Sequence, residues 1–225
     1  MPSLKAGRPV KGAERLARDI VRRIYERGMK PGDKFLSESE ALAAFGVSRA
    51  TLREALRYLQ IQGVLRIRTG PGGGHFVGQP KPESLASTIA LLLQFAGAPI
   101  NSIIDARRVI EPAIIREAAL NATAEDVAGM DRWLAEMEAH IDEDGPFMEA
   151  WHGLMGIVVA ASGNAFFRFM LPALWEIGRS GGFGSTAYGR TTGLALLRRL
   201  RDAMADRNGD RAAAVIDEIF EMIRE

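Results

Sequence analysis

The chain contains no cysteine, so disulfide bonds and thiolate metal sites are excluded. It has only three histidines, and no apolar run approaches the roughly 18 residues needed to cross a bilayer. Residues 1–12 include basic side chains but lack the apolar segment of a secretory signal. These absences predict a cytoplasmic protein in a reducing compartment, with no membrane as a partner.

What the sequence does contain is an uneven distribution of charge. Its 225 residues suit one large domain or two smaller ones, and its net charge is only +1. Residues 1–78 carry 15 Lys and Arg against 7 Asp and Glu, whereas residues 79–225 carry 14 against 21. The balance indicates that only the N-terminal third meets a polyanion, although a solvated basic face would show the same charge.

Residues 13–78 show three helical patterns followed by an alternating one. Apolar spacing and capping residues predict helices at 13–28, 37–45 and 48–62. Residues 64–68 then alternate apolar and basic side chains, and residues 75–77 return after a glycine-rich turn. Three helices and a β-hairpin make a winged helix-turn-helix.

The third of these helices has two different faces. Leucines at helical spacing predict a buried stripe, which consists of Leu52, Leu56 and Leu59. Arginines recur every four residues on a separate stripe, which consists of Arg49, Arg53 and Arg57. Ser48 is expected to cap the N-terminus of the helix. This combination is what a recognition helix in a DNA major groove requires.

The rest of the chain is predicted to be entirely helical. Residues 79–83 contain two prolines and are expected to form a linker. Residues 84–225 contain seven helical segments with short connections, near 83–97, 100–121, 123–142, 145–162, 164–179, 188–207 and 209–224. The predicted fold class is therefore mostly α, with a winged helix-turn-helix joined to an antiparallel helical bundle.

Residues 13–78 resemble the DNA-binding domain of the GntR family of bacterial transcription regulators. The resemblance is carried by residues 29–38, 40–43, 45–49, 52–56 and 74–77. The remainder resembles the ligand-sensing FCD domain of the FadR-like branch, through residues 105–112, 151–152 and 161–164. The resemblance implies a homodimeric regulator, most often a repressor, that binds a palindromic operator and responds to a small metabolite.

Double-stranded DNA is thus the expected partner of the N-terminal domain. Arginine side chains can donate paired hydrogen bonds to guanine or phosphate, and hydroxyls at a helix N-terminus can bind phosphate. The candidate DNA contacts are Ser39, Ser48, Arg49, Thr51, Arg53, Arg57, Gly74 and His75. In the family, the position of Ser39 often carries a basic residue, so a serine weakens that contact. Residues 1–12 are predicted to be a disordered basic arm, and residues 7–9 resemble the core of an AT-hook.

In the helical domain, Arg107 is the leading candidate for effector binding. An arginine inside a bundle needs an acidic partner, which is either a bound organic acid or Glu111 one turn away. Many FCD domains hold a divalent metal with one carboxylate and three histidines. Here only His152 matches, since Met148, Leu197 and Glu221 occupy the other positions.

A metal cofactor is therefore not expected. Glu149 and His152, three residues apart on one helix, are two weak candidate ligands as well as candidate effector contacts. The sequence contains no nucleophile–base pair or phosphate loop, which argues against an enzyme tethered to DNA. An architectural DNA-binding protein without an effector is the other alternative to a metabolite-responsive regulator.

Overall fold

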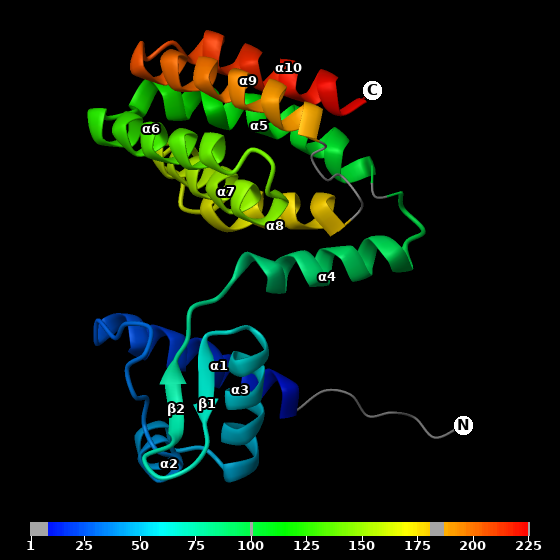
Figure 1. The fold of residues 1–225 in the computed structure, drawn as a ribbon. Helices are drawn as coiled ribbons and strands as arrows, with labels where there is room; N and C mark the ends of the chain where they lie inside the picture. Colours follow the sequence, from blue (N-terminus) through cyan, green and yellow to red (C-terminus); the bar gives the residue numbers. More distant parts are fainter. Residues whose placement is uncertain (1–8, 100, 181–186, 225) are drawn as a thin grey trace. The chain divides into compact units, whose positions relative to one another are not determined.

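The computed structural model describes residues 9–99, 101–180 and 187–224 and divides the chain into two compact units. The first unit is Met1–Ser84 and the second is Leu85–Glu225 (Figure 1). Within the described residues, no helix is both long and apolar enough to cross a membrane.

The first unit is a winged helix-turn-helix, as the sequence predicts. Its elements are α1 (Pro9–Glu26), α2 (Glu38–Phe45), α3 (Arg49–Ile61), β1 (Leu65–Arg68) and β2 (Gly74–Val77). Helix α1 packs against α3, and α2 lies against α3 as well. The apolar faces of these elements form one core, to which α1 contributes Leu16 and Ile20 and α3 contributes Leu52 and Leu59.

The wing is an antiparallel hairpin in which Leu65 pairs with Val77 and Ile67 pairs with His75. A third segment joins it, because the Phe35 N–H donates to the His75 carbonyl at 2.8 Å. These backbone hydrogen bonds tie the wing to the segment that leads into α2. The backbone of the wing is therefore fixed to the segment that precedes α2.

Two predictions for this unit need correction. Residues 9–12 belong to α1 and are not part of a disordered arm. Proline is tolerated in the first helical turn, and Gly12 lies close enough to Thr51 that an added Cβ would be 3.8 Å from its methyl group. The first turn of α1 is thus next to the start of α3. The rest of the predicted arm, residues 1–8, lies outside the described residues.

The second correction concerns β1, where the expected alternation of buried and exposed side chains does not occur. Leu65 is buried, but Ile67 is 55% exposed. A two-stranded wing has no second layer above its tip, so only its base reaches the core.

The second unit is a helical bundle with a single large core. Every predicted helix is present among the described residues, with ends that shift by up to three residues. The helices are α4 (Pro82–Phe95), α5 (Asn101–Asn121), α6 (Ala124–Ala139), α7 (Asp144–Ala161), α8 (Phe167–Ser180), α9 (Ala187–Ala205) and α10 (Gly209–Arg224). Helix α5 packs against α7 and α10, and α6 packs against α7 and α9.

Helix α4 starts inside the predicted linker and has apolar residues on two sides. Ala86 is buried in the bundle core, and Ile89 and Leu93 pack against it. The opposite side exposes Leu92 and Phe95, the latter 92% exposed. The only charged residue of this helix is Glu83.

The packing of α6 on α7 depends on a glycine. A Cβ at Gly153 would lie 2.4 Å from the ring of Trp133, whereas no described atom lies within 4 Å of a Cβ at Gly156. Gly153→Ala is therefore expected to lower the free energy of unfolding by about 1–3 kcal/mol, because the indole ring must shift in a packed interface. Urea or thermal denaturation of the purified protein measures this change.

Gly156→Ala is the matched control in the same helix. It is expected to raise the free energy of unfolding by about 0.5–1 kcal/mol, because alanine favours the helix and meets nothing there. Equal stability of the two variants would contradict the described packing of α6 on α7.

Candidate nucleic-acid interface and ligand site

The start of α3 is fixed by a short turn and a side-chain cap. Gly46 ends α2 in the left-handed conformation, with φ of 63°. Two residues later, the Ser48 hydroxyl accepts a hydrogen bond from the Thr51 N–H at 3.1 Å, and its oxygen lies 2.9 Å from the Thr51 hydroxyl. The two hydroxyls therefore order the first turn of α3, and both lie at its exposed N-terminal end.

The two faces of α3 are separated as the sequence predicts. Leu52 and Leu59 are buried, whereas Arg49, Arg53 and Arg57 are all exposed. Neither Arg49 nor Arg57 makes a hydrogen bond or ion pair with any residue that the structure describes. Two cationic groups thus stand along α3 without an internal partner, at its first turn and two turns further on.

Arg53 differs from its two neighbours because it has an acidic partner. Its Nε lies 3.3 Å from an oxygen of Glu38, the first residue of α2, and both side chains are partly exposed. An exposed pair of this kind contributes little to stability, and an anion can compete with it. Sequence reasoning did not assign a role to Glu38, because 15 residues separate it from Arg53.

Ser39 lies next to this pair on the exposed side of α2. Its hydroxyl oxygen is 3.2 Å from that of Ser37, the residue that caps the helix. The side chain is short, so its reach toward a ligand beyond the helix surface is smaller than that of the basic residue expected from the resemblance.

The turn of the wing is built from glycines for a steric reason. A Cβ at Gly73 would lie 2.3 Å from the carbonyl oxygen of Arg68, and Gly74 has φ of 134°. Lys34 Nζ donates to the carbonyl of Gly72 at 3.3 Å and so anchors this turn. The guanidinium of Arg68 lies 4.3 Å from the centre of the Phe76 ring. Lys34 and Arg68 were not among the sequence candidates.

His75 lies in β2 and is half-buried. Burial lowers the pKa of its imidazole below the ordinary value, and the nearby charge of Glu38 partly opposes this effect. The ring is therefore neutral at pH 7, which suits a hydrogen bond more than an ion pair.

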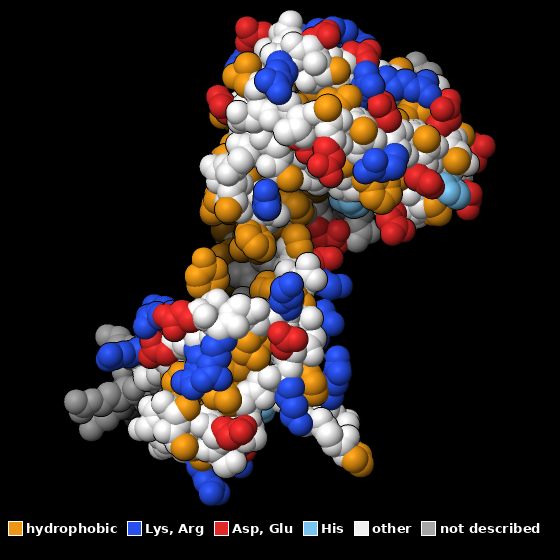
Figure 2. Space-filling view, turned by 90° about the vertical axis from the view of Figure 1, so that its left-hand side faces the viewer, with side chains coloured by type: hydrophobic (Ala, Val, Ile, Leu, Met, Phe, Trp, Pro, Cys, Tyr) orange, Lys and Arg blue, Asp and Glu red, His pale blue; other side chains and the backbone are white. Residues whose placement is uncertain are grey.

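Basic side chains gather on the surface of this unit. Figure 2 shows Lys and Arg over the visible face of the winged unit, with few acidic side chains among them, whereas both signs are mixed over the helical unit. A surface with this charge and an exposed, capped helix N-terminus can bind a polyanion.

The interior of the helical unit holds a buried polar cluster. Arg107 Nε donates to Glu111 Oε1 at 2.6 Å, and the indole N–H of Trp175 donates to the same oxygen at 2.8 Å. Both charged residues are buried, so the internal pair expected as one alternative is present. The second oxygen of Glu111 accepts no hydrogen bond from the described residues.

The rest of the Arg107 guanidinium is placed by an aromatic ring and a glycine. Its central carbon lies 5.4 Å from the centre of the Phe220 ring, and a Cβ at Gly178 would come within 3.4 Å of Nη1. Neither terminal nitrogen makes a hydrogen bond to the described part of the chain. The donors of these two nitrogens are therefore available to water or to an additional anionic partner.

His152 is close to this cluster, whereas Glu149 is not. The imidazole of His152 is half-buried, 5.0 Å from the ring of Trp151 and 6.3 Å from that of Trp175. Glu149 is exposed and forms no hydrogen bond with His152. The described residues hold no group of three or more His, Cys, Asp or Glu suited to a metal ion.

Known families match both units. Residues 12–77 match the family described as bacterial regulatory proteins, gntR family, and residues 102–222 match the FCD domain. The second match alone covers more than half of the chain.

Individual relatives are more distant. The transcriptional repressor NanR of Klebsiella aerogenes is 26% identical over 158 residues, which cover 69% of this chain and 60% of that protein. The Uxu operon transcriptional regulator of Escherichia coli K12 is 30% identical over 141 residues, or 63% of this chain and 52% of that one. The matched parts of this chain therefore span little more than half the length of these relatives.

Among solved structures, a GntR protein of Streptococcus agalactiae has a similar fold. The comparison gives a TM-score of 0.76 at 19% identity and covers 94% of this chain and 98% of that one. At this identity the similarity bears on the fold alone.

The Glu38–Arg53 pair generates a prediction for DNA binding. Glu38→Gln removes the partner of Arg53 and one negative charge next to α3, so the arginine becomes available to phosphate. We expect tighter binding to duplex DNA of arbitrary sequence, with a slope of log affinity against log salt that is steeper by about 1. Fluorescence anisotropy over a salt series measures both quantities.

Glu54→Gln provides the control, because Glu54 is an exposed acid on α3 with no recorded partner among the described residues. It removes the same charge without releasing Arg53. If both variants change the salt slope equally, net charge and not the release of Arg53 explains the effect.

Proposed function

This chain belongs to the GntR family of transcription regulators and carries a C-terminal FCD domain, and from that premise we propose that it is a homodimeric repressor. It binds a palindromic operator through α3 and the wing, and an organic acid in the helical unit alters that binding. The similarity to relatives named as a repressor and as an operon regulator supports a role in repressing transcription. The proposed site of action is the cytoplasm.

Arg49 carries the proposal for DNA. It is the first residue of α3, directly after the Ser48 cap, and its guanidinium is exposed without a recorded partner among the described residues. In a major groove this position reaches base edges, where arginine donates two parallel hydrogen bonds to guanine. Arg53 and Arg57 follow on the same face, and the hydroxyls of Ser48 and Thr51 contact phosphate.

The wing supplies the second contact. The glycines of its turn let the backbone approach a groove closely, and His75 follows them as a neutral hydrogen-bonding group. The role of the wing is to position the domain, because contacts to the sugar–phosphate backbone of DNA fix the orientation of a protein on the duplex without reading the base sequence.

A homodimer is supported by the surface of α4. A helix with apolar residues on two sides is typical of a position between two packed surfaces, yet Leu91, Leu92 and Phe95 are exposed in the single chain. Figure 2 shows hydrophobic side chains gathered at the level of α4. A second copy covers this surface, and the two-fold symmetry of the dimer gives the operator its palindromic form.

The effector site is centred on Arg107. Its two terminal nitrogens bind the carboxylate of an organic acid, while Nε stays on Glu111. The second oxygen of Glu111 accepts a hydrogen bond from a ligand hydroxyl, so a hydroxy acid suits the site best. His152, Trp151 and Trp175 line the same region with aromatic rings.

No metal takes part in this proposal. His152 is the residue that matches the family's metal ligands, and Glu149 on the same helix is exposed. Direct pairing with a buried arginine replaces the role of the metal in holding the carboxylate. The chain acts by binding and not by catalysis.

Arg49→Ala tests the DNA site. It is expected to weaken binding to the preferred operator by about 10–200-fold, because one paired contact to a base is lost. Genomic fragments selected on the purified protein identify the operator, and anisotropy measures its affinity. Arg27→Ala removes the same charge at an exposed position after α1 and is expected to change affinity only slightly.

An Arg49→Ala variant that keeps the operator affinity of the wild-type protein would contradict the assignment. A wild-type protein that enriches no sequence and responds to no acid would favour the alternative of an architectural DNA-binding protein.

Arg107→Gln tests the effector site. It is expected to abolish the response of operator binding to organic acids while leaving binding without acid unchanged. Because breaking a buried ion pair is destabilising, the variant that also carries Glu111→Gln keeps the interior neutral and hydrogen-bonded. A screen of hydroxy acids by thermal shift identifies the ligand. If operator binding still responds to that acid in both variants, the effector does not bind at Arg107.

A further inference from the structure

The outer face of the wing, opposite its buried side, carries three cations around one aromatic ring. Strand pairing places Arg66 beside Phe76, and an isolated bridge places Lys34 on the other side of Phe76. Arg68 shares this face, because side chains two residues apart on a strand point to the same side. His75 precedes Phe76 in β2 and therefore points to the other face. The outer face is thus a part of the wing that the proposed contact of His75 does not use.

Lys34 holds the tip of the wing. Its Nζ donates to the Gly72 carbonyl in the turn, and its side chain passes Gly74, where an added Cβ would lie 3.6 Å from Cε. Gly74 pairs with Arg68 across the hairpin, so Lys34 and Arg68 flank the same point of the wing. The contact of Lys34 fixes this tip to the segment that precedes α2.

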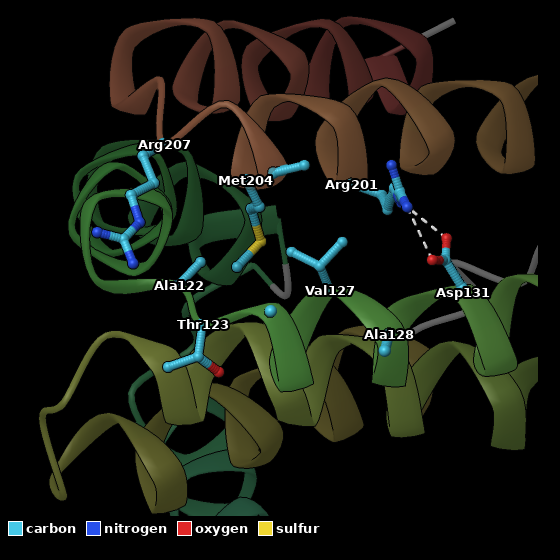
Figure 3. A pocket seen from close by; sticks show the side chains of 10 residues that line it. Ala122, Thr123, Val127, Ala128, Asp131, Arg201, Met204 and Arg207 are labelled. Atoms are coloured by element: carbon cyan, nitrogen blue, oxygen red, sulfur yellow. Dashed lines mark hydrogen bonds and ion pairs between the residues drawn. The ribbon is translucent and has the colours of Figure 1, made fainter.

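Arg68 is the last residue of β1 and is held by a ring instead of a carboxylate. Its central carbon lies 4.3 Å from the centre of the Phe76 ring. Arg201 in the helical unit shows the alternative, because Asp131 accepts hydrogen bonds from its Nε and Nη2 at 2.7 and 2.8 Å (Figure 3). A carboxylate occupies the donors of a guanidinium, whereas a ring under its face leaves them available. No described residue accepts a hydrogen bond from the guanidinium of Arg68, so this group is positioned and still able to donate.

A positioned guanidinium at the tip of a hairpin suits the minor groove of DNA. This groove is about 6 Å wide, which is too narrow for a helix but wide enough for an extended side chain. A·T pairs present only acceptors there, whereas guanine adds an amino group, which is a donor. A guanidinium can only donate, and it therefore distinguishes A·T from G·C pairs. The narrow groove of A·T tracts also has an enhanced negative potential that attracts arginine.

The wing also adjoins α3, the helix assigned to the major groove. Only residues 62–64 separate α3 from β1, and Leu65 at the base of β1 is buried in the same core as Leu59 of α3. The major and minor grooves alternate along a duplex, so a hairpin that adjoins a helix in the major groove lies next to a minor groove. The three cations of the outer face form no ion pair with any carboxylate that the structure describes, which leaves them to an anionic partner.

We propose that Arg68 reads A·T base pairs in the minor groove beside each half-site, and that Phe76 is the residue that positions it. This inference rests on the proposed function and adds to it, because the wing there fixes the orientation of the domain without reading sequence. Arg66 lies on the same face, makes no ring contact with a described residue, and binds phosphate. The operator therefore extends beyond the base pairs that α3 contacts.

Selection by the full-length protein from a library with a fixed operator core and random flanking base pairs tests the proposal. The wild-type protein is expected to enrich A·T at the same flanking positions of both half-sites. A G·C pair at those positions is expected to weaken binding about tenfold, as measured by fluorescence anisotropy. Inosine in place of that guanine removes the amino group from the minor groove and leaves the major-groove edge unchanged, so it is expected to restore the affinity.

Arg68→Ala is the informative variant, and since Arg68 is exposed its replacement leaves the core intact. It is expected to bind duplexes with A·T, G·C and inosine flanks equally. Phe76→Leu keeps an apolar side chain without the ring and is expected to reduce the flank preference at least about threefold, whereas Phe76→Tyr is expected to retain it. Arg66→Ala, the matched control, removes the same charge from the same strand. It is expected to weaken binding to all flanks alike, with a salt slope that is less steep by about 1.

Two results would overturn the proposal while leaving the proposed function in place. One is an operator that is selected and depends on Arg49 but has no A·T preference in its flanks. The other is a flank preference that persists in Arg68→Ala or that inosine does not restore. A preference retained in full by Phe76→Leu would overturn the positioning role of Phe76. Selection of no operator at all would contradict the proposed function and this inference together.

Discussion

Burial of one face of α3 is the constraint on which the DNA-binding surface depends. Leu52 and Leu59 are almost fully removed from water in the core with α1, which fixes the rotation of α3 about its axis. With that rotation fixed, the arginines of the opposite stripe must face outward. The Ser48 cap then decides where the helix begins and so which arginine stands at its first turn. The outward direction of the stripe thus follows from packing, and only Arg53 is also held by another element, through Glu38 of α2.

In the helical unit, packing fixes the position of a charged group, the buried guanidinium of Arg107. Burying Arg107 is unfavourable unless its hydrogen bonds are made, and Glu111 accepts only the one from Nε, on the oxygen to which Trp175 also donates. In the proposed function, the two terminal nitrogens of Arg107 bind the effector. The packing around such a site is expected to differ between its empty and occupied states, because a bound anion changes the net charge of the interior. A difference of this kind allows a bound metabolite to shift the equilibrium between two arrangements of the helices.

Local patterns in the sequence were enough to predict most of the fold. Helix periodicity separated the two faces of α3, and capping residues such as Ser48 and Thr123 marked helix starts that the structure contains. The errors came from tertiary contacts. The first turn of α1 lies beside Thr51 of α3, a contact that periodicity does not show, and the exposure of Ile67 depends on what lies above the wing. Glu38 owes its interest to its position in space beside Arg53, which periodicity does not reveal.

The central claim is that Arg49 at the start of α3 reads guanine in the major groove of a palindromic operator. Methylation interference on a selected operator tests it most directly, because methylation of guanine N7 blocks the acceptor that arginine uses. Two symmetric groups of sensitive guanines are expected, one in each half-site, and they should lose their sensitivity when Arg49 is replaced. Binding that is indifferent to guanine methylation would contradict it.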